Sequence, residues 1–174
     1  EPGSGTRMTM RIPVTVAIQS VMLVRAGGQV FAVPTRNIQE ICSVTPASLT
    51  QEPTQAFYTL RNNPLPVYPL NHLLQVETAN VPALTGDDRL ELLILHHDVH
   101  CIALAVDAVL EKQEVFVRDI HPDLRAIPAV GGVSLLGNGN VVVILDPENL
   151  CTLASQKPHN VLASFSTGTG TSHA

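Results

Sequence analysis

The sequence predicts an all-β protein built from small barrels or a sandwich, with few and short helices. Many short apolar runs recur at regular spacing along the 174 residues, with turn-forming residues between them, as is typical of all-β folds. Apolar residues make up 45% of the chain but aromatic residues only 3%. The core is therefore expected to consist of branched side chains, which favour strands. No strand–helix alternation with long crossovers occurs, which argues against a parallel α/β sheet.

The first half of the chain is expected to form two hairpins separated by a strand and a loop. Pro13 disfavours a helix in the first apolar run, Gly27-Gly28 marks a turn between two β-rich runs, and Pro34 ends the second run. Residues 37–44 fit a helical period only weakly, so a strand is preferred over a short helix. The expected elements are an extended segment 12–18, a hairpin from 21–24 and 30–33, a strand 37–44, a loop 45–55, a hairpin from 56–61 and 65–68 around Asn62-Asn63-Pro64, and one or two helical turns at 69–74.

The second half repeats this order of elements after a loop-like stretch at 76–88. Asp146 and Pro147 form a good helix start, with an acidic cap and proline at the first helical position. The Ser/Thr/Gly-rich end of the chain is typical of a flexible linker. The expected elements are strands 90–95 and 101–106 around a polar tip at 96–100, an extended segment 109–118 with a polar break at 111–114, an irregular segment 119–129, a hairpin around 137–139, a helix from 146, and a flexible tail 155–174.

The stretch Gly137-Asn138-Gly139 raises the question of a phosphate-binding loop. A Walker-type loop needs a lysine after its last glycine, and a dinucleotide fingerprint needs a helix there. No lysine follows, and the next run, 141–145, is Val-Val-Val-Ile-Leu, which predicts a strand. Asn-Gly between two apolar runs is instead a strong hairpin signal. The stretch is interpreted as a turn, so no cofactor is expected.

Composition excludes several classes of function. The net charge is −5 and no run of basic residues occurs, so nucleic-acid binding is not expected. No apolar segment is long enough for a signal peptide or a membrane span, so no membrane insertion is expected. The three cysteines are odd in number and far apart, without a CxxC pair. They predict neither a disulfide framework nor a Cys-rich zinc site, and they suit a reducing, cytoplasmic setting.

Two further groups of residues are candidate sites. His97, His100 and Cys101 are of zinc-ligand type and lie around a hairpin tip, so a zinc-binding β-barrel is an alternative. A hairpin tip is also exposed and tolerates any polar residues, so no metal site is expected. Nucleophilic catalysis finds no support, since GxSxG is absent and each cysteine adjoins an apolar run as a small hydrophobe would. No catalytic residue is predicted.

A set of motifs, each weak alone, occurs in an order that resembles CheA-type chemotaxis histidine kinases. The match lies where the ATPase domain passes into the C-terminal CheW-like regulatory domain. The resemblance implies two five-stranded, SH3-like β-barrels packed together, which agrees with the repeated order of elements. The motifs are GSGT at 3–6, IPVTVAI at 12–18, VMLV at 21–24, GQVFAVP at 28–34, IQEI at 38–41, LR at 60–61, LPV at 65–67, IALAVDAV at 102–109, QEV at 113–115 and LGNGNVVVILD at 136–146.

The resemblance also implies a domain organisation. Residues 1–18 would be the end of the ATPase domain and the junction. Residues 19–154 would be the CheW-like domain, with its two barrel subdomains split near 76–88, and residues 155–174 a tail or linker. The implied function is docking without catalysis by this fragment, whose parent chain would be a histidine kinase. The implied partners are a CheW-like adaptor, the chemoreceptor signalling tip and other domains of the parent kinase. A freestanding CheW-like adaptor is the alternative within the same fold.

Three residues are carried over as candidate partner contacts. Ile38 matches an apolar position at a groove between the barrels, and Arg61 matches the arginine of the family's LRG motif, whose glycine is Asn62 here. Glu40 is the third candidate. Each residue could instead have a purely structural role, here called its plain reading. In that reading Ile38 is a core residue, Arg61 is a solvated or ion-paired residue, and Glu40 covers the edge of a strand.

Overall fold

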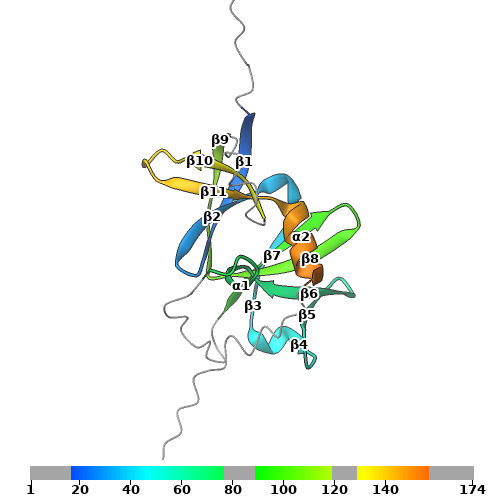
Figure 1. Ribbon diagram of the computed structural model, residues 1–174. Helices are drawn as coiled ribbons and strands as arrows, with labels where there is room; N and C mark the ends of the chain where they lie inside the picture. The colour runs from blue at the N-terminus through cyan, green and yellow to red at the C-terminus, as the bar shows by residue number, and fades with distance from the viewer. Residues whose placement is uncertain (1–16, 77–88, 119–128, 157–174) are drawn as a thin grey trace, which may run out of the picture.

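The computed structural model describes residues 17–76, 89–118 and 129–156, and the all-β prediction is confirmed (Figure 1). Residues 1–16 of the expected ATPase-domain end and junction (1–18) lie outside the described residues. So do the tail beyond 156, most of the loop 76–88 and most of the segment 119–129. The helices are short, as expected: α1 (Leu70–Leu73) and α2 (Pro147–Gln156), with 3-10 turns η1 (Thr35–Asn37) and η2 (Pro46–Ser48). None of the helices in these ranges is long and apolar enough to cross a membrane.

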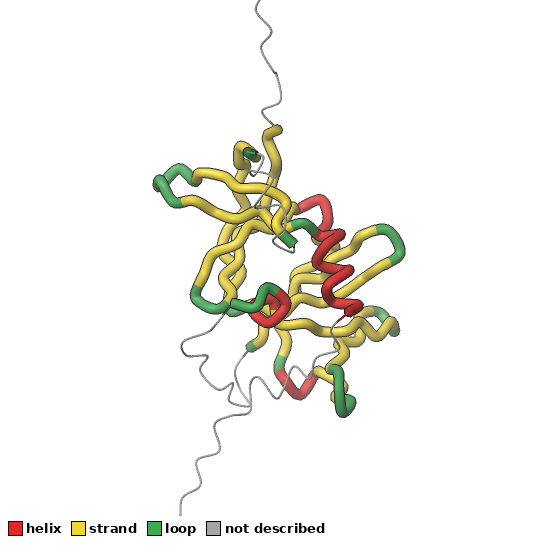
Figure 2. The backbone as a smooth tube through the Cα atoms, viewed as in Figure 1, coloured by secondary structure: helices red, strands yellow, loops and turns green. Residues whose placement is uncertain are grey.

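The strands form two sheets, one of five strands and one of six (Figure 2). The first sheet has the order β10-β11-β2-β1-β9 and the second has β3-β7-β8-β6-β5-β4. The first consists of β1 (Ala17–Ala26), β2 (Gln29–Pro34), β9 (Ala108–Val117), β10 (Val130–Leu135) and β11 (Val141–Leu145). The second consists of β3 (Ile38–Val44), β4 (Leu49–Gln51), β5 (Ala56–Leu60), β6 (Asn63–Pro69), β7 (Leu90–His97) and β8 (His100–Val106).

The expected division of the two barrels near 76–88 is wrong. The first sheet takes β1 and β2 from before this stretch and β9, β10 and β11 from after it, whereas β7 and β8 complete the second sheet. The chain therefore forms two strands of the first barrel, then all the strands of the second barrel, and then the last three strands of the first. The first sheet closes on itself because Arg118, at the end of β9, bridges Val133 of β10 through two backbone hydrogen bonds of 2.9 and 3.2 Å.

Most of the expected elements are present, and the exceptions have simple causes. Residues 45–55 are not all loop, since η2 and the short β4 lie within them; this adds the sixth strand. The polar tip at 96–100 is shorter than expected, because β7 and β8 pair as far as His97 opposite His100. No break occurs at 111–114, because β9 continues through these mostly exposed polar residues, three of which pair with β1. The helix α2 continues two residues past 154.

The stretch 137–139 is a turn, as predicted. The Leu136 carbonyl accepts a hydrogen bond from Gly139 N at 2.9 Å, and Leu136 N donates to Asn140 O at 2.8 Å. Gly139 has φ +84°, a left-handed conformation that glycine adopts without steric strain. The next helix starts as expected, with Asp146 Oδ1 accepting from Glu148 N at 3.0 Å.

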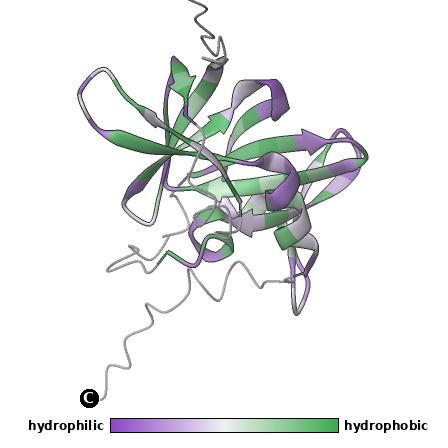
Figure 3. Ribbon diagram, turned by 45° about the horizontal axis from the view of Figure 1, so that its top comes forward, coloured by the Kyte–Doolittle hydropathy of each residue, from purple (hydrophilic) through white to green (hydrophobic). Residues whose placement is uncertain are grey.

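The core has three parts, because alternate residues of each strand face opposite sides of a sheet. Within the first barrel pack Val21, Leu23, Ala32, Val115, Val142 and Ile144. Within the second pack Val44, Leu49, Ala56, Leu65, Val67, Leu90, Leu92, Ile94, Ala103 and Ala105. Between them lies the largest cluster, here called the shared core, which takes residues from both sheets and from α1 and α2. Figure 3 shows that the strands are largely hydrophobic and that several of the turns between them are hydrophilic.

Candidate functional site

Two of the three predicted contact residues meet in the structure. Arg61, at the turn between β5 and β6, donates from Nη2 to Glu40 Oε2 on β3 at 3.1 Å. The Arg61 side chain is 75% exposed and that of Glu40 36% exposed. Solvent screens such a pair, so it contributes at most about 1 kcal/mol to stability. The geometry agrees with the plain reading of Arg61 as an ion-paired residue, and it also places both charges on one accessible surface.

The turn that presents Arg61 has left-handed backbone at both central residues. Arg61 has φ +48° and Asn62 has φ +69°, between the paired residues Leu60 and Asn63. Positive φ at both positions is the geometry of a type I′ hairpin turn, which favours Asn or Gly. Asn62 therefore adopts the conformation that the glycine of the LRG motif would allow. Arg61 takes the same backbone conformation without being a residue that favours it.

Changing Asn62 tests this turn. We expect Asn62→Ala to lower the free energy of unfolding by about 1 kcal/mol, because alanine disfavours left-handed backbone. Asn62→Gly should leave it unchanged or raise it slightly. Urea unfolding of both variants measures the difference. Equal stability of the alanine and glycine variants would show that the turn does not hold this conformation in solution.

Behind the ion pair, Cys42 on β3 and Tyr58 on β5 lie close together, both partly buried. Burial raises the pKa of the Cys42 thiol, which the Tyr58 hydroxyl opposes by hydrogen bonding and the nearby Glu40 carboxylate reinforces. Burial also raises the pKa of the Tyr58 hydroxyl, with the adjacent Cys42 adding to it. A thiol with a raised pKa stays protonated near neutral pH and is a poor nucleophile. This pair therefore supports the strands rather than reactive chemistry.

Ile38 is not part of that cluster. It begins β3, pairs with Leu95 of β7, and packs half-buried against the shared core. A register shift between Ile38 and Glu40 separates the two along the strand. The environment of Ile38 agrees with its plain reading as core.

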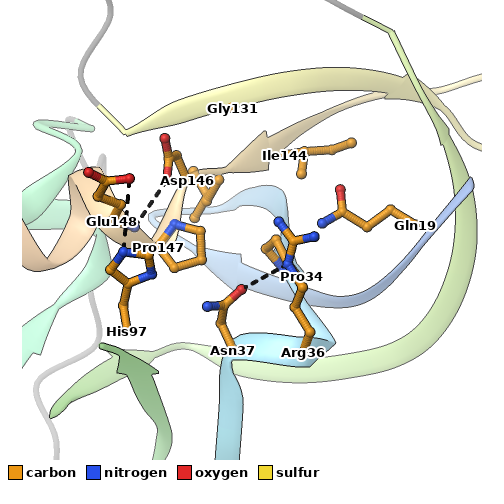
Figure 4. Close-up of a pocket in the computed structure, with 11 residues that line it drawn as sticks. Gln19, Pro34, Arg36, Asn37, His97, Gly131, Ile144, Asp146, Pro147 and Glu148 are labelled. Atoms are coloured by element: carbon orange, nitrogen blue, oxygen red, sulfur yellow. Dashed lines mark hydrogen bonds and ion pairs between the residues drawn. The ribbon is translucent and has the colours of Figure 1, made fainter. Parts of the chain in front are cut away.

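A cleft of about 520 Å³ lies between the first barrel, η1 and the start of α2 (Figure 4). Its polar lining comes from Gln19, Arg36, Asn37, His97, Asp146 and Glu148, and its remaining lining from Pro34, Gly131, Ile144, Leu145 and Pro147. Asn37 Nδ2 donates to His96 O at 3.3 Å and so ties η1 to β7. Sequence reasoning missed this site, since its lining comes from five separate stretches of the chain that only the interleaved topology brings together.

The zinc-ligand candidates do not converge. His97 Nε2 lies 3.7 Å from Asp98 Oδ2 and 3.9 Å from Glu148 Oε2 on α2, and His97 is paired opposite His100. Cys101 Sγ instead contacts Gln39 Oε1 at 3.6 Å. Over the described ranges, no group of three or more His, Cys, Asp or Glu side chains is arranged to hold a metal ion.

Two apolar cross-strand pairs are exposed on the first barrel. Leu135 and Val141 flank the turn between β10 and β11 and are 56% and 70% exposed. Ile18 and Phe116 pair where β1 begins and β9 ends, and both are also largely exposed. Such pairs at the ends of a barrel are features of protein-interaction surfaces when they are contiguous. The sequence predicts an extended run for each of these residues, but only the structure shows that their side chains face solvent.

Two small barrels around a shared core define a double-barrel β domain. The CheW-like domain family matches this chain over residues 20–155. The chain therefore belongs to that family. Among solved structures, the scaffolding protein TtCheW from Thermoanaerobacter tengcongensis superposes with a TM-score of 0.59 at 15% identity, covering 75% of this chain and 90% of that protein. At this level of identity the likeness concerns the fold.

The curated relatives include larger signalling proteins. The chemotaxis protein CheA of Halobacterium salinarum is 34% identical over 149 residues, covering 86% of this chain and 21% of the relative. CheA of Salmonella typhimurium is 29% identical, covering 83% and 21%. A gliding motility regulatory protein of Myxococcus xanthus is 28% identical, covering 82% and 18%. The chain thus spans about a fifth of the length of these relatives.

Proposed function

We propose that this chain is the adaptor-binding regulatory domain of a CheA-like histidine kinase, which couples receptor and adaptor arrays to kinase activity in the cytoplasm. The support is its similarity to the CheA proteins over most of its length, at 34% and 29% identity. In this proposal residues 1–18 join an ATPase domain and residues 155–174 form a tail or linker. The domain itself carries out no catalysis. Its partners are a CheW-like adaptor, the chemoreceptor signalling tip and the remaining kinase domains.

The observation that carries docking is the exposed pair Leu135–Val141. Their side chains lie on neighbouring strands at one end of the first barrel, beside a turn with open space around Gly137 and Gly139. The fully buried centre of a protein interface is more apolar than the rest of the protein surface. We propose that the CheW-like adaptor covers this pair. Glu40 and Arg61, on the second barrel, would make a separate polar contact, and Ile38 would hold β3 in place beneath it.

Docking is tested by titrating the ¹⁵N-labelled chain with its cognate CheW-like adaptor and following amide shifts. We expect Leu135→Asp with Val141→Asp to weaken binding at least about tenfold, because two desolvated carboxylates would oppose an apolar contact. Val99→Asp is the matched control, since Val99 is a fully solvated apolar residue on the second barrel. It should change binding by less than about twofold. Unchanged spectra of the parent chain at high adaptor concentration would contradict the proposal.

Receptor contact through the ion pair needs a separate test. We expect Glu40→Arg with Arg61→Glu to keep the domain folded, because the reversed pair can still form, but to weaken association with a receptor-tip fragment. Sedimentation with that fragment measures the effect. Binding equal to the parent chain would remove Glu40 and Arg61 from the receptor surface without affecting the adaptor proposal.

A further inference from the structure

Among the described residues, the start of β1 has a paired strand on one edge only, and the cleft lies beside its other edge. Strand β2 pairs with β1 only from Val21 onward, because β2 ends at Pro34, whereas β1 pairs with β9 from Ala17. On the other side of β2, strand β11 pairs in parallel at Val143 and Ile144 and then continues to Leu145. Since Ile144 pairs with Ala32, β11 ends level with β2, and only the first residues of β1 continue past Pro34.

The cleft of about 520 Å³ lies at this end of β1. Its lining includes Gln19 of β1, Ile144 and Leu145 of β11, Asp146 just after β11, and Arg36 and Asn37 of η1, which follows Pro34. Neighbouring strands lie about 4.8 Å apart, so an extended chain that paired with the start of β1 would lie within reach of this lining. Figure 4 shows Gln19 and Ile144 on one side of this space, with Arg36 reaching toward Gln19 from η1.

The backbone of β1 is available on this side. The Ser20 carbonyl faces η1, where it accepts a hydrogen bond from Thr35 Oγ1 at 3.1 Å. Alternate residues of a strand direct their backbone groups to the same edge, so the N–H and C=O of Ile18 point to this side. Within the described ranges, no strand pairs with β1 at Ile18 on that edge. The Ile18 side chain is 63% exposed.

Arg36 and the acidic side chains of the cleft lie at different ends (Figure 4). Near β1 lies Arg36, whose Nε donates to Asn37 Oδ1 at 3.4 Å. Between described residues, no ion pair involves Arg36. At the other end the carboxylates are already engaged: Asp146 caps α2, and Glu148 lies 3.9 Å from His97. The charge open to a ligand is therefore the guanidinium, which favours a carboxylate.

We propose that this cleft binds an extended, acidic segment of another protein, which adds as a strand to β1 at Ile18 and places a carboxylate against Arg36. The ligand is an extended chain because the free edge of a strand binds the backbone N–H and C=O groups of another extended segment. Pairing with Ile18 would supply the backbone hydrogen bonds, and Arg36 would set the preference for acidic side chains. This site is separate from the Leu135–Val141 surface and does not depend on adaptor docking.

The proposal is tested with a capped heptapeptide of sequence TVTETVT and its partner TVTKTVT, titrated into the ¹⁵N-labelled chain. The acidic peptide should produce saturable amide shifts at Ile18, Gln19 and Arg36 at millimolar concentration. It should bind about twofold to fivefold more tightly than the lysine peptide, as one exposed ion pair allows. Shifts that are absent at millimolar peptide, or that cluster elsewhere, would overturn the proposal.

Two variants separate the contributions. Arg36→Gln should keep peptide binding but abolish the preference for glutamate over lysine. Ile18→Pro removes the N–H that would pair with the peptide, and proline is tolerated at a strand edge; it should abolish binding, whereas Ile18→Val should bind as the parent chain does. Retained binding by a folded Ile18→Pro protein would refute strand addition, and a retained preference in Arg36→Gln would refute the role of Arg36. The Leu135→Asp, Val141→Asp protein should bind the peptide normally, so failure of adaptor docking remains distinguishable.

Discussion

Replacing Leu104 with alanine should lower the free energy of unfolding by about 2–5 kcal/mol, the range for large-to-small changes in a well-packed core. Leu104 is fully buried on β8 and belongs to the shared core. It pairs with Leu93 of β7 on one side and with Tyr68 of β6 on the other, both of which are also in that core. A cavity at this position cannot be filled easily, because strands fix its surroundings on both sides.

The same substitution should destabilise both barrels together. The shared core takes Val24 and Phe31 from the first sheet and Leu93 and Leu104 from the second, so neither barrel keeps this apolar surface buried when the other unfolds. Urea unfolding, followed by circular dichroism and by amide signals from each sheet, should give one coincident transition in the parent chain and in the variant.

The matched control is Leu135→Ala, which removes the same atoms from a side chain that is more than half exposed on β10. Its effect should remain within about 0.5 kcal/mol. Separate transitions for the two sheets in the Leu104→Ala protein would show that each barrel is stable alone, and would contradict the role assigned to the shared core.

The hairpins could be predicted from sequence because their signals are local. Gly27-Gly28 and the stretch 137–139 each lie between two apolar runs, and both turns form where expected. The interleaving of the barrels could not be predicted in this way. It depends on the pairing of β1 with β9 and of β11 with β2, which joins residues far apart in the chain. The repeated order of elements suggested that each half of the chain forms one barrel. In the structure, each barrel contains strands from both halves of the chain.

The candidate site was predictable only in part. The resemblance selected Glu40 and Arg61, but their 3.1 Å contact joins residues 21 positions apart and required the fold. Alternation could not show that Leu135 and Val141 face solvent, because β11 is apolar throughout and in β10 the polar Ser134 is buried whereas Leu135 is exposed. The cleft depends on where β2 stops, which Pro34 signals, and on what lies beside it, which no local pattern signals.

Replacing Gly132 with valine should open the first barrel along one seam. A Cβ atom at Gly132 would lie 3.0 Å from Val117 Cγ1 and 3.4 Å from Arg118 O, which is tighter than ordinary contact. This is the place where β9 meets β10 through the backbone hydrogen bonds between Arg118 and Val133. Since Arg118 O itself accepts one of these bonds, the strands cannot separate to make room without weakening the bridge.

We expect Gly132→Val to lower the free energy of unfolding by about 1–3 kcal/mol, as overpacking typically does. Hydrogen exchange at the Arg118 and Val133 amides should accelerate more than exchange at Leu104 in the second sheet. Gly137→Val is the control, since its Cβ would meet nothing within 4 Å, and it should leave both amides protected. Unchanged protection of Arg118 and Val133 in a folded Gly132→Val protein would mean that β9 and β10 are not held together there. In that case the first sheet would be an open sheet rather than a closed barrel, and its edge at β10 would be free to pair with a partner.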